Sequence, residues 1–510
     1  MSKLFNKEKK KEIKFPSAFT VLFIVLVLAA ILTYIVPAGS YDRLQYDSEA
    51  QEFVKTGAEG EEKGRVSASQ DVLDKLNITV PFENFINEDI KKPVAIPGSY
   101  NELEQRPQGF MDVASAPIEG ITDSIGIIVF VLLLGGCIGV LNKTGTFDSG
   151  IAALSKLTKG KEFLMVTIIS SIVALGGTTF GLAEETIAFY PILMPIFLAS
   201  GFDAMVTIAA IYMGSSIGTM FSTTNAFSVV VASNAAGISF KEGIGIRIVS
   251  LIIAQGISLW YIYRYSKKVR KNPSNSIIAE DMPRIKEQYL SGYDPENVAD
   301  FNFRRIAMLI VFIGAFPIMI YGVMQLEWWF EEMSTLFLIV GILLIILSGL
   351  PEQEAVNSFL DGASDLVSVA LIIGVARGIN IILDNGMISD TMLYGASNII
   401  SGMNGILFST VQMILFSFLG IFIPSSSGLA TLSMPIIAPL ADTVSIGRDV
   451  VVSAYNWGQG WMSIIAPTGL ILATLEMVDV SYNKWIKFIA PLMGILLVLS
   501  IVMLGVQTVI

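Results

Sequence analysis

The 510-residue chain has no histidine, a single cysteine and few charges, which make up 15% of its residues. Without histidine, the chain has no Ser-His-Asp triad, no histidine proton relay and no zinc-protease site. Cys137 cannot form an intramolecular disulfide, and its apolar surroundings predict a small buried side chain. Soluble proteins carry about 25% charged residues. The shortage of charge, beside 53% hydrophobic residues, indicates a polytopic membrane protein, for which we predict no metal site and no bound cofactor.

The beginning of the chain sets an expected orientation. Six lysines lie among residues 3–14. The apolar run that follows, about 18 residues, is long enough to span a bilayer and too long for the core of a secretory signal. We predict a basic cytoplasmic N-terminus over residues 1–15 and a first transmembrane helix over 16–41, in the inner membrane of a bacterium. Residues 42–106, with 14 acidic and 8 basic side chains, are too polar for lipid and form a predicted extracytoplasmic insertion.

Four short stretches of the first half recur in the same order in the second half. The pairs are "IEGITDS" (118–124) with "LDGASDL" (360–366), "LNKTGTF" (141–147) with "LDNGMIS" (383–389), "GLAEETIAFYPILMPI" (181–196) with "GLATLSMPIIAPL" (428–440), and "GSSIGTMFSTTN" (214–225) with "GQGWMSIIAPTG" (458–469). The leading span of the first copy is predicted to run inward and that of the second outward, so the copies are inverted. Inverted repeats with interrupted helices are typical of secondary transporters. An old duplication without a transport role is the alternative.

We therefore predict an all-α polytopic membrane protein of two inverted repeats, each with a re-entrant helical hairpin and a broken transmembrane helix. The repeats cover 107–266 and 351–510, separated by a cytoplasmic linker at 267–302 and by connecting transmembrane helices at 303–350. The hairpins are expected at 163–199 and 404–442, and the broken helices at 203–235 and 448–476.

The breaks and the hairpin tips supply polar groups at membrane depth. A broken helix leaves backbone N–H groups free, and these attract an anion, whereas a break exposed to lipid is not tolerated. Neutral donors there suit a carboxylate, and proline marks the second break because it cannot continue the helical ladder. The predicted substrate-binding residues are Thr178, Thr179, Ser222, Thr223, Thr224, Asn225, Ser425, Ser426, Ser427, Asn456, Gly458, Gln459, Pro467 and Thr468. Packing of small residues between helices is the alternative interpretation of each stretch.

Two adjacent carboxylates, Glu184 and Glu185, lie in the first hairpin. A charge at the bilayer centre costs roughly 2.5–3.5 kcal/mol on insertion scales, so it calls for a reason. One hypothesis is that at least one of them binds a cation: a substrate amine, a sodium ion or a proton. The alternative is that both stabilise the second helix of the hairpin through its dipole. The second copy has Thr431 and Leu432 at these positions, which favours the first hypothesis.

A further charge, Arg377, lies in the middle of a predicted span. It needs a partner, and three candidates are open: Glu184 or Glu185, a substrate carboxylate, and Asp384, which is on nearly the same helix face but about 10 Å away along the axis. A purely structural ion pair is also possible for this arginine.

Several of these stretches together resemble the anaerobic C4-dicarboxylate carrier family, and within it the YfcC-type branch. They are "GGTTFGLAEETIAFYPILMPI", "NKTG", "STTN", "ARG", "PSSSGLA", "MPIIAPLAD", "IAPT" and the N-terminal "VPAGSY". The resemblance covers nearly the whole chain except the insertion and the linker. It implies an ion-transporter-superfamily fold with elevator motion, usually as a homodimer. The motif at 176–191 is similar to that of arginine/ornithine antiporters, which implies that Glu184 and Glu185 bind a cation.

The sequence thus predicts a secondary transporter for a small carboxylated solute, most plausibly a basic amino acid exchanged for a related one. The alternative is a C4-dicarboxylate carrier coupled to Na⁺ or H⁺, in which Arg377 helps to bind the second carboxylate. A channel would need a continuous pore, which two hairpins would close. An intramembrane enzyme would need a nucleophile with a base or a metal cluster, and none is visible in the sequence.

Overall fold

The computed structural model of the chain describes residues 17–57, 60–87, 90, 92–146, 149, 160–290, 302–326, 328–403 and 405–510. The predicted N-terminal segment 1–15 lies outside the described residues, as does the part of the predicted linker at 291–301.

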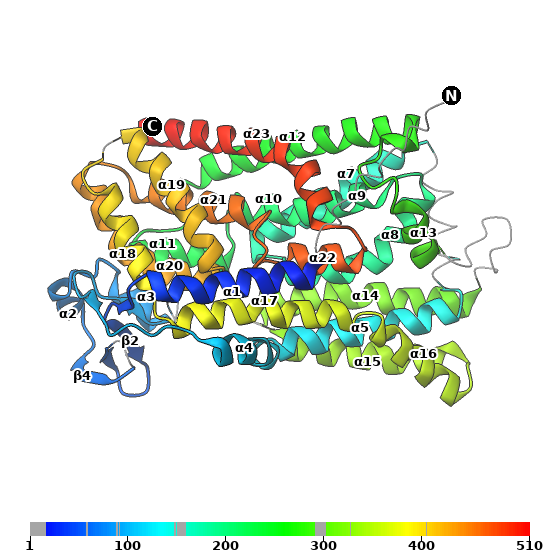
Figure 1. Cartoon of the computed structure of the whole chain (residues 1–510), viewed down its shortest axis with the longest axis horizontal. Coiled ribbons are helices and arrows are strands. Elements are labelled where there is room, and N and C mark those ends of the chain that lie inside the picture. Colours follow the sequence, from blue (N-terminus) through cyan, green and yellow to red (C-terminus); the bar gives the residue numbers. More distant parts are fainter. Residues whose placement is uncertain are drawn as a thin grey trace, which may run out of the picture.

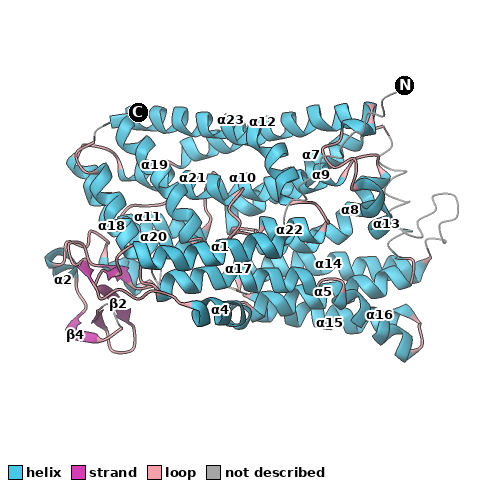
Figure 2. Ribbon diagram, viewed as in Figure 1, coloured by secondary structure: helices cyan, strands magenta, loops and turns pink. Residues whose placement is uncertain are grey.

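The described chain is mostly helical, as its composition predicts (Figure 2). Nine of its helices are long and apolar enough to cross a membrane: Ala18–Ile35, Ile125–Lys143, Glu162–Thr179, Ile244–Lys271, Phe303–Gly322, Phe330–Ser348, Glu352–Asn385, Gly405–Phe422 and Tyr482–Val509. The protein is therefore a multi-pass membrane protein. Two shorter apolar segments, Ala204–Met220 and Ala226–Ala236, fall in the predicted first broken helix.

The helices form two layers, called lower and upper here after their places in Figure 1. The lower layer holds α1 (Ala18–Ile35), α4 (Phe110–Asp123), α5 (Ile125–Lys143), α14 (Phe303–Gln325), α15 (Phe330–Ser348), α16 (Glu352–Ser364) and α17 (Val367–Asn385). The upper layer holds α7 (Glu162–Phe180), η1 (Glu184–Phe189), α8 (Tyr190–Ala199), α9 (Ala204–Ile208), η2 (Ala209–Met213), α10 (Gly214–Met220), η3 (Ala226–Val230), α11 (Val231–Ala236), α12 (Ile244–Lys271), α19 (Gly405–Phe422), α20 (Ser426–Thr443), α21 (Arg448–Ser463), α22 (Ile471–Met477) and α23 (Tyr482–Val509). Outside the layers lie η4 (Pro273–Asn275) and α13 (Met282–Leu290), while α18 (Ser389–Ile400) joins α17 to α19.

Glycines bring the lower-layer helices together. A Cβ on Gly120 would lie 2.1 Å from the Gly374 carbonyl oxygen, and one on Gly362 would lie 2.3 Å from that of Gly135. Because the early part of α4–α5 meets the late part of α16–α17, the two helix pairs run antiparallel. Small residues permit such close backbone approach between membrane helices.

The expectation of an all-α chain is wrong for the insertion, which is a small β domain between α1 and α4 (Figure 1). Its four-stranded antiparallel sheet has the order β4-β3-β2-β5, from Glu62–Ser67, Glu52–Thr56, Arg43–Asp47 and Val94–Ala95. A second ladder pairs β1 (Gly39–Ser40) with β6 (Asn101–Glu102), and two short helices, α2 (Gln70–Lys75) and α3 (Phe82–Ile86), complete the domain. One residue of each of these two strands, Leu44 in β2 and Phe53 in β3, is buried, while the residues beside it are half-buried or exposed. The overall membrane composition conceals this local pattern.

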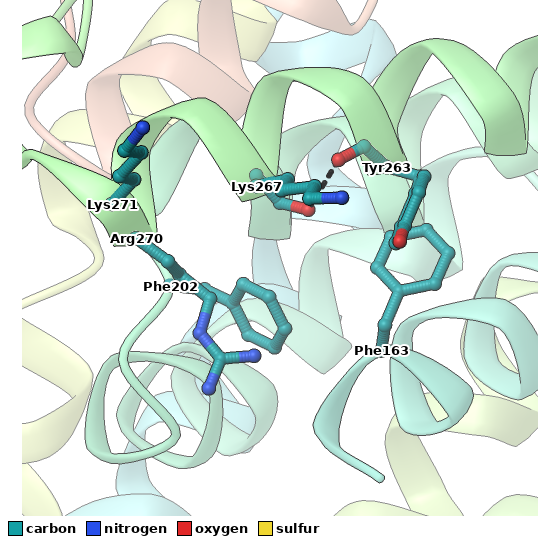
Figure 3. Close-up of a pocket in the computed structure, with 7 residues that line it drawn as sticks. Phe163, Phe202, Tyr263, Lys267, Arg270 and Lys271 are labelled. Atoms are coloured by element: carbon teal, nitrogen blue, oxygen red, sulfur yellow. Dashed lines mark hydrogen bonds between the residues drawn. The ribbon is translucent and has the colours of Figure 1, made fainter. Parts of the chain in front are cut away.

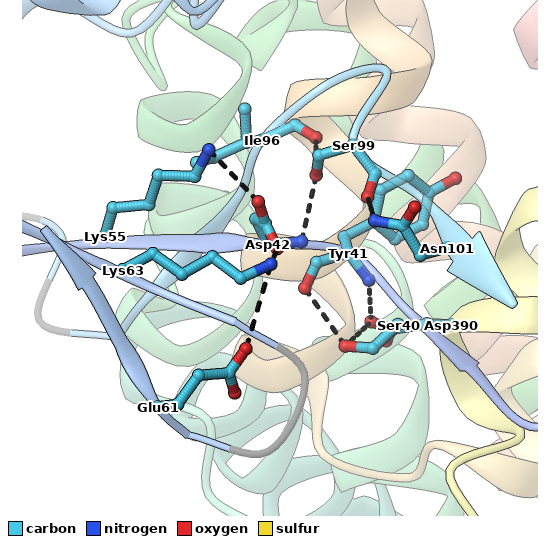
Figure 4. Close-up of polar contacts among 10 residues, drawn as sticks. All are labelled: Ser40, Tyr41, Asp42, Lys55, Glu61, Lys63, Ile96, Ser99, Asn101 and Asp390. Carbon is cyan, nitrogen blue, oxygen red and sulfur yellow. Dashed lines mark hydrogen bonds and ion pairs between the residues drawn. The ribbon is translucent and has the colours of Figure 1, made fainter. Parts of the chain in front are cut away.

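A buried carboxylate, Asp42, ties the sheet together (Figure 4). Its Oδ1 accepts a hydrogen bond from Lys63 Nζ at 2.7 Å, and its Oδ2 lies 3.1 Å from Lys55 Nζ. Burial by itself raises the pKa of the Asp42 carboxyl, but the hydrogen bonds and charges of Lys63 and Lys55 outweigh it, so the pKa is lowered overall.

We expect Asp42→Asn to destabilise the sheet at neutral pH and to have little effect in acid. A carboxyl whose folded-state pKa is depressed stabilises the fold above its ordinary pKa, and this contribution is lost as the pH falls through the folded pKa. Because both lysines are partly exposed, the contribution is about 1 kcal/mol or less. This contribution is measured by amide hydrogen exchange of β2 and β3. The parent protein and Asp42→Asn are compared from pH 7 to below about pH 3.9. A difference that stays constant over that range would contradict the assignment.

Candidate functional site

Both ends of the first helical hairpin, α7 and α8, lie beside the C-terminal end of α12 (Figure 3). Arg270 Nη1 is 3.4 Å from Glu162 Oε2 at the start of α7, and its guanidinium lies 5.4 Å from the centre of the Phe202 ring after α8. Phe163 packs on Tyr263 of α12, with 5.0 Å between the ring centroids. Phe163, Phe202, Tyr263 and Arg270 are among the residues that line a cavity of about 330 Å³. The chain therefore enters and leaves the first hairpin at the same end of α12, the end from which the linker starts.

Both ends of the second helical hairpin, α19 and α20, lie beside the C-terminus instead. Ser409 Oγ at the start of α19 is 3.5 Å from Thr508 Oγ1. Asp449, just after the hairpin, accepts a hydrogen bond from Gln507 Nε2 at 2.7 Å. Thr508 and Gln507 lie at the C-terminal end of α23, and Arg448, next to Asp449, donates to Thr79 Oγ1 of the insertion at 2.9 Å. This hairpin therefore opens on the side of the insertion.

The helices are broken in both interrupted segments. Helix α10 ends at Met220, residues 221–225 are not helical, and η3 restarts at Ala226 with the Asn225 side chain accepting a hydrogen bond from Phe227 N at 2.9 Å. In the second segment α21 ends at Ser463 and α22 starts at Ile471. Both breaks leave backbone N–H groups without helical partners.

The first hairpin tip and the first break are hydrogen bonded to each other. Thr223 N donates to Thr178 Oγ1 at 3.0 Å, and Thr224 N donates to the Thr178 carbonyl at 3.1 Å. Asn225 Nδ2 donates to the Gly177 carbonyl at 3.2 Å. Thr178, Thr223 and Asn225 are buried, whereas Thr224 is exposed. Four of the predicted residues therefore form one polar cluster.

The second tip and the second break repeat this arrangement. Thr468 Oγ1 donates to the Ile421 carbonyl at 3.2 Å, and Gln459 Nε2 donates to the Pro424 carbonyl at 3.3 Å. Tyr455 OH donates to the Ser426 carbonyl at 2.5 Å, a contact that the sequence did not suggest. The tip itself is capped by Ser425, whose Oγ accepts from Gly428 N at 3.2 Å.

The contacts between the two broken segments are reciprocal. Tyr212 OH donates to the Ser463 carbonyl at 2.8 Å, and Asn456 Nδ2 donates to the Thr219 carbonyl at 3.2 Å. The two donor residues, Tyr212 and Asn456, are 244 positions apart in the sequence, and so are the two acceptor residues, Thr219 and Ser463. Asn456 Nδ2 also donates to the Met220 carbonyl at 2.8 Å, at the edge of the first break.

Glycine contacts between hairpin and broken helix are paired in the same way. A Cβ on Gly214 would lie 2.7 Å from the Ser170 carbonyl oxygen, and one on Gly458 would lie 2.2 Å from that of Met413. Each broken helix thus needs a glycine where it crosses the first helix of its own hairpin.

Glu184 and Glu185 form the first turn of η1, between the two helices of the first hairpin. Successive residues of a 3₁₀ helix point about 120° apart, so the two carboxylates diverge. Glu185 Oε2 accepts from Ala183 N at 3.1 Å. Among the described residues, the Glu184 carboxylate has no ion-pair partner and no hydrogen bond to another residue. Element η1 packs on α5 and on η2, so these side chains lie where the upper layer meets the lower one.

The side chains of several other predicted residues have partners outside this cluster. Arg377 Nε forms an ion pair with Asp123 Oδ2 at the end of α4, a partner that the sequence argument did not include. Asp384 is exposed and is the residue before the last of α17, and no described hydrogen bond or ion pair joins it to Arg377. Thr179 Oγ1 bonds to the Leu175 carbonyl of its own helix at 2.6 Å. Ser222 Oγ is within 3.1 Å of Ser228 Oγ, and Pro467 lies within the second break.

The sequence profile of the family described as "C4-dicarboxylate anaerobic carrier" matches residues 15–509. An "Uncharacterized protein" of Haemophilus influenzae is 49% identical, with 98% of each chain covered. The "Putative basic amino acid antiporter YfcC" of Escherichia coli is 32% identical, with 99% of each chain covered.

Two solved structures are similar along nearly their whole length. MtrF of Neisseria gonorrhoeae, described as illuminating a class of antimetabolite efflux pumps, has a TM-score of 0.39 and 16% identity, covering 98% of this chain and 96% of that one. The YdaH transporter of Alcanivorax borkumensis has a TM-score of 0.37 and 13% identity, covering 96% of this chain and 98% of that one.

Proposed function

We propose that this chain, which belongs to the C4-dicarboxylate anaerobic carrier family, exchanges one basic amino acid for another across the membrane. Membership of that family makes it a membrane transporter and not an enzyme. The choice of solute is our inference. It is supported by the relative named as a basic amino acid antiporter and by the chemistry of the first hairpin.

The observation that carries the proposal is the placement of Glu184 and Glu185 near a cluster of neutral donors. In this structure Thr223 N and Asn225 Nδ2 donate to Thr178 and Gly177 of the first hairpin tip; released from these partners, the same neutral donors suit an α-carboxylate. The Glu184 carboxylate, which forms no ion pair among the described residues, suits an ammonium or guanidinium group. Charge-assisted hydrogen bonds of this kind are about twice as strong as neutral ones.

The reciprocal contacts support two inverted repeats. The pairs Tyr212–Ser463 and Asn456–Thr219 exchange roles between the copies, as a two-fold axis requires. The antiparallel packing of α4–α5 on α16–α17 fits the same axis, and the two hairpins open at opposite ends of the upper layer. An elevator mechanism would carry the upper layer, with the polar cluster, past the lower layer.

The sequence-level alternative, a C4-dicarboxylate, fits the site less well. It would need a second cationic anchor, for which Arg377 was the candidate. Arg377 belongs to the lower layer and is paired with Asp123. Two glutamates in the hairpin would also repel a dianion.

We further propose that the linker end of the molecule is cytoplasmic. Helix α12 ends there in Lys268, Arg270 and Lys271, and basic residues are enriched at cytoplasmic ends of membrane helices. The insertion is then extracytoplasmic. A homodimer in the inner membrane remains our expectation from the family resemblance.

The proposal is tested with purified protein in liposomes preloaded with ornithine. We expect uptake of labelled arginine that requires internal ornithine, since exchange couples the two solutes. Empty liposomes and liposomes preloaded with succinate are the controls. Succinate exchange with arginine inert would overturn the proposal, and so would arginine uptake that is independent of the internal solute.

A further inference from the structure

We infer that the β domain is a gate on the insertion side, and that Lys92 is the positioning residue by which it holds the tip of the second hairpin. This inference rests on the proposed transport by movement of the upper layer, but it does not depend on which solute is carried. It assigns a role to a domain that the sequence leaves without one.

The β domain is anchored to the lower layer. Both of its ends continue into lower-layer helices, α1 and α4, and Gln108 N donates to Thr33 Oγ1 of α1 at 2.8 Å. Gly39 N donates to the carbonyl of Met387, just after α17, at 2.9 Å.

Asp390 lies in the first turn of α18, which directly follows α17, and strengthens the anchor at this end of α17 (Figure 4). This buried carboxylate accepts hydrogen bonds from Tyr41 N at 2.9 Å, Ser40 Oγ at 3.1 Å and Arg43 Nη2 at 3.1 Å. Tyr100 stacks on Tyr394 with 4.2 Å between ring centroids. A buried charge held by several donors is costly to separate from them, so we expect these contacts to persist through the cycle.

On its other side the β domain touches the upper layer through weaker contacts. Lys92 Nζ donates to Ser427 Oγ at the second hairpin tip, at 2.9 Å, and Lys92 is exposed. Asn84 Nδ2 donates to the Asn234 carbonyl at 3.3 Å, and Arg448 Nη1 donates to Thr79 Oγ1 at 2.9 Å. Strand β5 packs on α20. Exposed single contacts of this kind are weak, so they can break and form again.

Lys92 is the member of this set that reaches a predicted substrate-binding residue. Lys92 is exposed as a whole, but desolvation of its amine and the nearby charge of Arg377 lower the pKa of that amine. Together with the hydrogen bond to Ser427, this indicates that the amine lies between the hairpin tip and the lower layer. If the upper layer moves toward the linker side, Ser427 leaves Lys92. The contact therefore stabilises one end state of the cycle and not the other.

A reducible cross-link tests whether the contact must break. In a Cys137→Ala background, Lys92→Cys and Ser427→Cys are joined by a bifunctional thiol reagent whose length matches the lysine side chain. Exchange is compared with that of the same double variant before cross-linking, because Ser427 is itself a predicted substrate-binding residue. We expect this exchange to stop on cross-linking and to return on reduction, which also shows that the variant is folded. The matched control joins Tyr100→Cys to Thr391→Cys, whose parent hydroxyls are 2.9 Å apart. This pair lies within the anchor, so exchange should continue.

Two outcomes would overturn the inference: exchange that continues with Lys92→Cys and Ser427→Cys joined, or exchange that stops equally in the control. Failure of the proposed function is distinct from both, because the protein without cross-links would then not exchange arginine for ornithine at all. In that case the same pairs are tested with whichever solute the protein carries.

Single substitutions give a second readout. Removing a contact that favours one end state shifts the equilibrium toward the other state. We expect Lys92→Met to change KM on the two sides of the membrane in opposite directions, by about two- to five-fold, with Lys92→Arg close to the parent protein. A change of maximal rate alone, equal on both sides, would mean a merely structural role and would refute the positioning role.

Discussion

Replacing Glu184 with glutamine is expected to reduce arginine/ornithine exchange by about 100-fold or more. Glutamine keeps the shape of the side chain but removes the negative charge that would face the guanidinium or ammonium group. Leaving a buried charge without its partner costs about 3–5 kcal/mol, and each 1.4 kcal/mol is about a tenfold change in affinity. Glu185→Gln should have the smaller effect, because the Glu185 carboxylate already accepts a hydrogen bond from Ala183 N. The measurement is exchange in liposomes together with arginine-induced stabilisation in thermal melting.

Glu352→Gln is the matched control. Glu352 is also an acid in the first turn of a helix, at the start of α16 in the lower layer, so its change tests the helix dipole without the site. If Glu184 and Glu185 act only through the dipole, all three variants should lose stability by about 0.3–1 kcal/mol and keep exchange. Full exchange by both hairpin variants would refute cation binding by these residues.

Alanine at Gly458 or Gly214 is expected to destabilise the protein strongly and to abolish exchange. The new Cβ at Gly458 would lie 2.2 Å from the Met413 carbonyl oxygen, and that at Gly214 would lie 2.7 Å from the Ser170 carbonyl oxygen. Backbone cannot yield as a flexible side chain does, so the broken helix must move away from its hairpin. Overpacking costs about 1–3 kcal/mol and occasionally more, and we expect the larger loss at Gly458. Thermal melting in detergent and exchange in liposomes measure the two effects.

Gly256 provides the control, because a Cβ there meets nothing within 4 Å. It lies in α12, so Gly256→Ala should stabilise the helix by up to about 1 kcal/mol and leave exchange unchanged. Melting temperatures for Gly458→Ala and Gly256→Ala that do not differ would refute the close contact between α21 and α19.

The sequence predicts the membrane class and the family, and it identifies the residues around Thr178 and Asn225 that the structure brings together. These features depend on signals that are visible in the sequence alone: the length of apolar runs, the interruption of helices by polar residues, and the recurrence of motifs. Gly214 and Gly458 could be paired from the sequence for the same reason, because each is the first residue of one of the two recurring stretches at 214–225 and 458–469.

Some contacting pairs could not be predicted from the sequence. Their two residues lie far apart along the chain, and no repeating pattern relates them. Asp123 meets Arg377 only because α4 and α17 run antiparallel. Lys92 meets Ser427 because the β domain folds over the second hairpin, and its strands are too short to stand out in a membrane protein. Tyr455, which bonds to the Ser426 carbonyl, looks like an ordinary core aromatic in the sequence.

If the two halves are inverted copies, as we propose, the reciprocal contacts between them have a consequence for the energy of the transport cycle. If the two copies had identical sequences, exchanging their conformations would convert the inward-open state into the outward-open state without changing the free energy. The two states would then be equally populated. The glutamate pair belongs to one copy and the lysine contact to the other, so this degeneracy is lifted. We therefore expect the substrate-free protein to populate one state, with its binding site open to one side of the membrane, more than the other.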